Sequence, residues 1–194
     1  MPKYGSGGYR MKFFHMADLH LGKKLLGEPL WKEQQYILSR VVAMSDEEKP
    51  EAVLLCGDIY DKSIPSSEAV GLLDWFLEEL SVRGIQTFLI SGNHDGAQRL
   101  QFASGILKKE GIHIAGTFKG GPEHIVLSDA FGPVHVWMLP FLRPGMLRPF
   151  AEEIPETYEE AVKTALHGAV LHREERNLLL AQKNKALLEK QDYE

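Results

Sequence analysis

Three short apolar segments, each followed at once by a polar turn, constrain the fold of this 194-residue chain more than any other feature. They cover residues 13–17, 52–56 and 87–90, and each has the length and composition of a buried β-strand. Apolar residues at helical spacing predict helices over residues 31–45 and 66–83, in the intervals between these strands. This alternation predicts an α/β protein with a mixed, largely parallel sheet flanked by helices.

The remainder of the chain continues the alternation of helix and strand. The elements expected there are a helix over 98–110, a strand over 112–115, a hairpin formed by 124–127 and 134–139, a helix over 156–172 and a strand over 177–181. No internal repeat interrupts this order, and the length suits one domain with a substantial core.

The polar turn after each of the first three strands carries side chains that bind metal ions. In chain order the turns are Asp18-Leu19-His20, Gly57-Asp58-Ile59-Tyr60-Asp61 and Gly92-Asn93-His94-Asp95. Right-handed crossovers bring the carboxyl ends of parallel strands to one edge of a sheet, so we expect the three turns to meet there. In an extended backbone, the spacing of Asp18 and His20 points both side chains the same way.

Carboxylate, imidazole and amide ligands without thiolates suit divalent ions such as Mn²⁺, Mg²⁺, Fe²⁺ or Zn²⁺. Two such ions clamp a phosphate ester and lower the pKa of a water molecule. Asp58, in the middle turn, is the best candidate to bridge them. His94 would then act on the phosphoryl group or the leaving oxygen, with Asp95 orienting its ring. Asp61 fits a supporting role in the turn better than a ligand role.

Composition narrows the possible functions. The net charge of −5 provides no global basic field for nucleic acid, so a phosphate-bearing substrate must be attracted locally. Cys56 is the single cysteine, which excludes an internal disulfide and favours a reducing compartment, the cytoplasm. No apolar segment approaches the roughly 20 residues that span a bilayer. The glycine-rich residues 1–10 resemble no signal peptide and are expected to form a flexible extension before the fold begins at Met11.

Taken together, the three turns resemble those of the calcineurin-like metallophosphoesterases in residue type, order and strand context. The residues Leu21-Gly22, Lys62-Ser63-Ile64-Pro65 and Pro140-Phe141-Leu142-Arg143-Pro144 further resemble the nuclease subunits of bacterial nuclease–ATPase complexes. The resemblance covers about residues 11–181 and implies the family's sandwich fold. It also implies a manganese-dependent DNA exonuclease and hairpin endonuclease that works with an ATPase subunit in recombination and repair.

The resemblance assigns a role to each residue of the turns. Asp18 and His20 would hold the first metal ion, Asp58 would bridge the two ions, and Asn93 would hold the second. His94 would be the catalytic histidine and not a ligand.

The resemblance also implies partners. A homodimer would form through the helices that flank the third strand, where Trp75 and Val82 lie off the core-facing stripe of the 66–83 helix. Four basic residues lie on or near the predicted active edge, where they could contact DNA phosphates: Lys23, Lys24, Arg99 and Arg143.

One part of the family pattern is not matched. The family's site contains a histidine at the end of a later strand and a Gly-His-x-His motif beyond it. Residues 177–181 look like that strand, but Gln182 stands at the histidine's position and the chain ends twelve residues later. We therefore expect an incomplete metallophosphoesterase domain over 11–181, a divergent tail over 182–194, weak metal binding and low activity of this chain alone.

Three interpretations remain open from the sequence. The first is a DNA nuclease of the kind just described. The second is a metallophosphoesterase that acts on small phosphomonoesters or cyclic nucleotides. The third is a non-catalytic chain whose role is assembly through the dimer helices.

Overall fold

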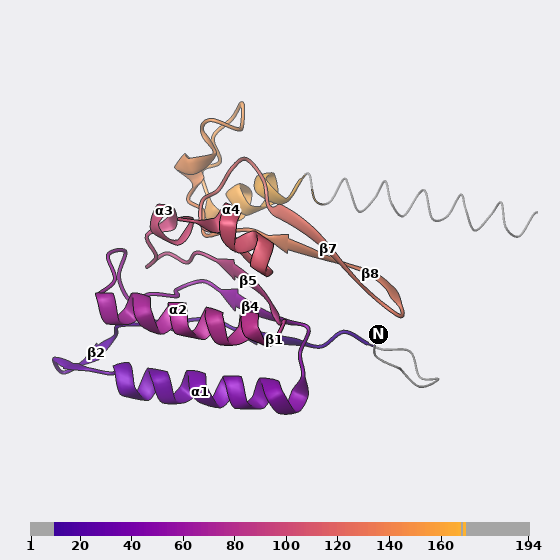
Figure 1. Ribbon diagram of the computed structural model, residues 1–194. Coiled ribbons are helices and arrows are strands. Elements are labelled where there is room, and N and C mark those ends of the chain that lie inside the picture. Colours follow the sequence, from indigo (N-terminus) through magenta and orange to yellow (C-terminus); the bar gives the residue numbers. More distant parts are fainter. Residues whose placement is uncertain (1–9, 168, 170–194) are drawn as a thin grey trace, which may run out of the picture. The chain divides into compact units, whose positions relative to one another are not determined.

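The computed structural model describes residues 10–167 and residue 169 (Figure 1). Two compact units make up the chain. The first contains the described part of residues 1–118 together with 123–141, and the second contains 119–122 and the described part of 142–194. The expected N-terminal extension up to residue 9, the strand over 177–181 and the tail over 182–194 lie outside the described residues.

A four-stranded parallel sheet forms the centre of the first unit. Its strands are β1 (Phe13–Met16), β4 (Ala52–Cys56), β5 (Gln86–Ile90) and β6 (Ile112–Ala115). They lie in the order β1-β4-β5-β6, and every neighbouring pair is parallel. The order in space therefore equals the order in the chain. The strands predicted from the three apolar segments, and the predicted strand over 112–115, are confirmed.

Helices α1 (Trp31–Glu48) and α2 (Ser67–Val82) cover one face of this sheet, as Figure 1 shows. Crossovers of one hand between strands placed in chain order put both helices on the same side. The Ser66 hydroxyl caps α2 by accepting the N–H of Ala69 at 3.3 Å. The core on this face includes Leu38, Val42, Val53, Leu55, Leu73, Phe76, Leu80 and Leu89. Trp75 packs against this core, whereas Val82 is 80% exposed.

The opposite face of the sheet packs against the β-hairpin formed by β7 (Glu123–Asp129) and β8 (Gly132–Met138). A second apolar cluster fills this side, with Ala52, Phe88, Ala115, Leu127 and Met138 as its buried members. The predicted hairpin is therefore present, and it completes an α/β sandwich in which the parallel sheet is the middle layer.

The single helix predicted over 98–110 is wrong. The structure has three short pieces, α3 (Ala97–Leu100), α4 (Ser104–Leu107) and the 3₁₀ turn η1 (Lys108–Glu110). The break occurs at Ala103, whose φ of +59° is incompatible with a continuous right-handed helix. Nearby, the Gln101 side chain donates to the carbonyl of Ile114 and accepts the N–H of Gly116, which ties the bend to the end of β6. These contacts are tertiary, so the helical spacing of the sequence does not reveal them.

The remaining elements are small. The two-residue strands β2 (Lys24–Leu25) and β3 (Glu28–Pro29) pair with each other between β1 and α1. In the second unit, η2 (Pro144–Leu147) is a 3₁₀ turn and residues 158–167 are helical, within the helix predicted over 156–172. Among the described helices, none is both long and apolar enough to cross a membrane.

The half-buried imidazole of His113 is expected to make stability depend on pH. Its ring stacks on Phe88 with centroids 4.9 Å apart, and its Nδ1 is buried without a hydrogen-bond partner. Burial, and to a lesser degree Lys108, lowers the pKa of His113 below the ordinary value of 6.5. As the pH falls through that value, the unfolded chain binds a proton that the folded chain resists, so the free energy of unfolding decreases.

We therefore expect His113→Leu to flatten the loss of stability between about pH 7 and pH 5, measured by urea unfolding at each pH. The exposed His15→Gln serves as the control and should leave that slope unchanged. An identical slope in wild type and His113→Leu would show that His113 is not the group responsible.

Candidate active site

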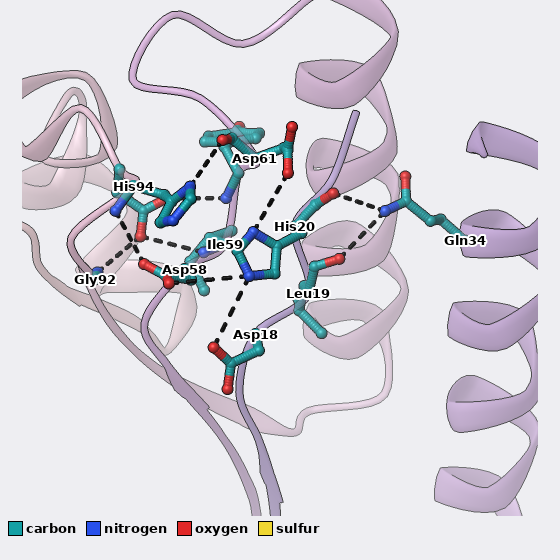
Figure 2. Close-up of polar contacts among 11 residues, drawn as sticks. Asp18, Leu19, His20, Gln34, Asp58, Ile59, Asp61, Gly92 and His94 are labelled. Atoms are coloured by element: carbon teal, nitrogen blue, oxygen red, sulfur yellow. Dashed lines mark hydrogen bonds and ion pairs between the residues drawn. The ribbon is translucent and has the colours of Figure 1, made fainter. Parts of the chain in front are cut away.

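The turns after β1, β4 and β5 meet at one edge of the sheet (Figure 2). Backbone pairing continues past the ends of the strands: the N–H of Asp18 donates to Gly57 O at 3.1 Å and that of His20 to Asp58 O at 2.9 Å. The third turn joins them because the backbone N–H of His94 donates to Asp58 Oδ1 at 3.0 Å. The predicted convergence of the three turns is thus present in the structure.

Asp18, His20 and Asp58 form the first group of converging ligand atoms. His20 Nε2 lies 3.9 Å from Asp18 Oδ1 and 3.9 Å from Asp58 Oδ2. These separations are too long for hydrogen bonds, and all three ligand atoms lie within 4.8 Å of one another. Two carboxylates and one imidazole gathered around a common point are a donor set for a divalent cation. The residues present therefore fit a metal ion.

A second group shares His20 with the first. His20, Asp61 and His94 also place ligand atoms within 4.8 Å of one another. His20 Nδ1 lies 3.5 Å from Asp61 Oδ1 but is buried with no hydrogen-bond partner, and the rings of His20 and His94 meet edge to face with centroids 4.9 Å apart. A buried polar atom without a partner is costly unless a cation or water satisfies it. Asp61 lies beside the ring nitrogen of His20 that faces away from Asp18 and Asp58, and its expected supporting role stays a prediction.

The backbone at the site is left-handed, which corrects the reason given for the convergence of Asp18 and His20. The φ angles are +57° at Asp18, +44° at His20 and +47° at Asp58. Residues with a Cβ rarely adopt this region, and it costs about 1–2 kcal/mol at each position. The two side chains therefore converge through a strained turn and not through an extended segment. Strain concentrated at polar residues is typical of functional sites.

The turns after β4 and β5 approach so closely that only glycine fits at two positions. A Cβ on Gly92 would lie 2.0 Å from Asp58 Oδ1 and 2.2 Å from Asp58 N. A Cβ on Gly57 would lie 3.1 Å from Gly92 Cα, and Gly57 has a φ of +85°. Gly92 therefore leaves the space that the Asp58 carboxylate occupies.

Gln34 of α1 holds the first turn in place, a role that the sequence did not indicate. Its Nε2 donates to the carbonyls of Leu19 at 3.2 Å and His20 at 2.7 Å (Figure 2). Its Oε1 accepts the N–H of Gly22 at 3.0 Å. One amide thus satisfies three backbone groups of a strained segment. In the sequence, Gln34 is only one polar residue of an amphipathic helix, so no local pattern distinguishes it.

Asp95 does not orient His94, contrary to the expectation from the sequence. Its Oδ2 accepts the N–H groups of Gly92 at 2.7 Å and Ile59 at 3.1 Å, and its Oδ1 accepts that of Tyr60 at 2.8 Å. The carboxylate therefore ties the turn after β5 to the turn after β4. Its role is to position the backbone that carries Asp58, and sequence proximity to His94 was misleading.

His94 is instead oriented by the backbone of Asp61. Its Nδ1 lies 3.0 Å from Asp61 O, and a carbonyl only accepts, so Nδ1 carries a proton. This hydrogen bond is the main cause that raises the pKa of His94, and the carboxylates of Asp58, Asp61 and Asp95 contribute as well. The imidazole is exposed, which leaves Nε2 available to a substrate.

The other predicted residues have the following positions. Asn93 is exposed in the turn after β5, and its role as a ligand stays a prediction. Arg99 is exposed on α3, and Arg143 precedes η2 in the second unit. Lys23 and Lys24 are exposed and line, together with Asp61, a hollow of about 500 Å³ beside the site. We call it the lysine-rimmed hollow.

The fold and the site define a class of protein. Residues 11–164 match the family model of the calcineurin-like phosphoesterases, and the chain belongs to this family of hydrolases that use divalent metals. Among curated proteins, the chain is 36% identical over 158 residues to the D subunit of the nuclease SbcCD from Staphylococcus epidermidis. The match covers 80% of this chain and 41% of the relative, so the chain spans about two fifths of that relative's length.

Gly92→Ala tests the close approach of the two turns. The added Cβ meets the carboxylate and backbone of Asp58, so we expect a loss of about 1–3 kcal/mol in the free energy of unfolding and weaker Mn²⁺ binding. Urea unfolding and calorimetric titration of Mn²⁺ measure the two effects. The matched control is Gly71→Ala in α2, where the added Cβ would meet nothing within 4 Å. Because alanine favours a helix more than glycine does, this substitution should raise the free energy of unfolding by about 1 kcal/mol. Equal effects of the two substitutions would contradict the steric argument.

Asp95→Asn tests the carboxylate that joins the turns. An amide keeps one acceptor but turns an NH₂ toward a backbone donor, so we expect a loss of about 2 kcal/mol in stability. Mn²⁺ affinity should fall with it because the Asp58 turn loosens. Asp74→Asn, on the exposed side of α2, should change neither quantity. A stable Asp95→Asn protein with unchanged Mn²⁺ affinity would refute the assigned role.

Proposed function

We propose that this chain is a metal-dependent phosphodiesterase acting on DNA, and that it works as the nuclease subunit beside an SbcC-type ATPase in recombination and repair. The observation that carries the proposal is the convergence of Asp18, His20 and Asp58 beside the exposed His94. The similarity to a nuclease subunit supports DNA as the substrate. Double-strand exonuclease and hairpin endonuclease activities are the reactions proposed.

The metal centre would be held by residues of all three turns. Asp18, His20 and Asp58 would bind one divalent ion, and Asp58 with Asn93 would contribute to a second, with Mn²⁺ the proposed ion. When bound, such ions polarise the phosphoryl group and lower the pKa of the attacking water. The donor set of oxygen and imidazole nitrogen suits these ions, and Gln34 and Asp95 hold the backbone that carries it in position.

His94 would supply the proton for the leaving oxygen. Because Nδ1 is held by the carbonyl of Asp61, the ring presents Nε2 outward. In the imidazolium form, Nε2 also carries a proton. Transfer of that proton from Nε2 to the departing sugar oxygen would neutralise the charge that develops there.

A homodimer is part of the proposal. Exposed apolar side chains lie on α2 and on the segment after β5, the two regions that flank the third strand of the sheet. They include Val70, Phe102 at 81% exposure and Ile106 at 71%. Val82 is also exposed, whereas Trp75 packs against the core and contributes less than expected. A reducing, cytoplasmic location is consistent with Cys56 as a free thiol.

The proposal is tested by separating metal binding from turnover. Wild type should hydrolyse hairpin and blunt-ended DNA in the presence of Mn²⁺, at the low rate expected from the sequence for this chain alone. Asp58→Asn should lose at least about a hundredfold in rate and bind Mn²⁺ more weakly, because a neutral amide replaces the carboxylate proposed to bridge the ions. His94→Gln should lose a similar factor while still binding Mn²⁺ at Asp18, His20 and Asp58.

Asp74→Asn is the matched acidic control and should retain both properties. Hydrolysis of p-nitrophenyl phosphate with no cleavage of DNA would favour a small-molecule phosphoesterase over the proposed nuclease. A dimer that binds no metal and has no turnover would favour an assembly role. Loss of Mn²⁺ binding in His94→Gln would reassign His94 as a ligand.

A further inference from the structure

The lysine-rimmed hollow, which the proposed mechanism does not use, opens beside the metal-binding turns. Five segments line it: the turn after β1, the β2–β3 hairpin, the first turn of α1, the loop over residues 61–66 and the first turns of α2. Its volume of about 500 Å³ falls within the range of pockets that hold small organic ligands. A mononucleotide is within that size range.

The floor and the mouth of the hollow differ in chemistry. Leu21, Ala69 and Leu72 are buried and form an apolar floor. Trp31 and Ile64 also line the hollow but are exposed, so they lie toward its mouth, with 43% of Trp31 accessible. An exposed indole beside an apolar floor is a surface on which a flat aromatic ring gains contact area.

Positive charge surrounds the mouth. Lys23, Lys24 and Lys62 line the hollow and are exposed. Two acidic residues, Asp61 and Glu68, line it as well. Asp61 is directed toward His20 at the metal-binding turns, so the lysines provide an excess of positive charge toward an incoming anion.

The hollow and the metal-binding turns share a wall. Asp61 lines the hollow while its Oδ1 lies 3.5 Å from His20 Nδ1 and its carbonyl holds His94. Gln34 likewise lines the hollow while bonding the turn that carries His20. A ligand in the hollow is therefore adjacent to whatever phosphate the turns hold.

We propose that the lysine-rimmed hollow receives one unpaired nucleotide of the DNA strand, with its base against Trp31 and the apolar floor and its phosphate among Lys23, Lys24 and Lys62. This inference rests on the proposed nuclease function and deepens it by naming the substrate feature recognised: a nucleotide unstacked next to the scissile phosphate. Aromatic contact is tolerant of base identity. The polar groups of Gln34 and Ser66 are already engaged with backbone groups, so all four bases should be accepted.

The test measures mononucleotide binding in the absence of metal, so it does not depend on catalysis. The full chain in EDTA is titrated calorimetrically with 2′-deoxyadenosine 5′-monophosphate, with 2-deoxyribose 5-phosphate and with 2′-deoxyadenosine. We expect the mononucleotide to bind at least about tenfold more tightly than either part, because base and phosphate contacts combine. Added salt should weaken its binding.

Variants locate the binding in the hollow. Trp31→Ala should weaken mononucleotide binding about tenfold with little effect on 2-deoxyribose 5-phosphate, and Trp31→Phe should retain most of the affinity. Lys24→Ala should weaken the binding of both the mononucleotide and 2-deoxyribose 5-phosphate. Lys109 is an exposed lysine on η1, and Lys109→Ala should weaken the binding of neither. Trp31→Phe also guards against a Trp31→Ala protein that fails to fold.

Equal affinities for the mononucleotide and 2-deoxyribose 5-phosphate would overturn the proposal, as would unchanged binding in both Trp31→Ala and Lys24→Ala. Absence of mononucleotide binding up to millimolar concentration would also overturn it. Because the titrations contain no metal, failure here combined with Mn²⁺-dependent DNA hydrolysis would leave the proposed nuclease function intact. Mononucleotide binding without any Mn²⁺-dependent DNA hydrolysis would contradict the proposed nuclease function but support the nucleotide site.

Discussion

The contact between the turns after β4 and β5 is the interaction on which the rest of the site depends. The Asp95 carboxylate accepts three backbone N–H groups from both turns, and Gly92 lets the Asp58 carboxylate lie between them. Hydrogen bonds from backbone donors to a charged acceptor are stronger than neutral ones. The sheet brings the strand ends together, but this carboxylate determines how closely the turns approach. The first turn then joins through the His20 N–H bonded to Asp58 O.

The strained backbone of the first turn is stabilised by contacts with other parts of the fold. The left-handed backbone at Asp18 and His20 is held by backbone pairing with the second turn and by the Gln34 amide. The backbone pairing extends from the parallel sheet and the Gln34 amide belongs to α1, and both elements are well packed. Asp18 Oδ1 and Asp58 Oδ2 consequently remain directed at His20 Nε2, while Asp58 Oδ1 accepts the N–H of His94.

The sequence was sufficient to predict the layer architecture, because apolar runs and helical spacing report directly on burial. It also predicted the meeting of the three turns, since parallel strands align their carboxyl ends. It did not predict the roles of Asp95 and Gln34 or the break at Ala103, because these depend on contacts between residues distant in the chain. The orientation of His94 was missed for the same reason: its partner is a backbone carbonyl, which no side-chain pattern encodes.

The clustered carboxylates link ion affinity to folding. Asp18, Asp58 and Asp61 all lie around His20, and mutual repulsion among like charges opposes the compact state of the ion-free chain. A cation that binds only the folded form adds RT ln(1 + [M]/Kd) to the free energy of unfolding. The stability of this protein would therefore rise with the free concentration of any cation that these side chains bind.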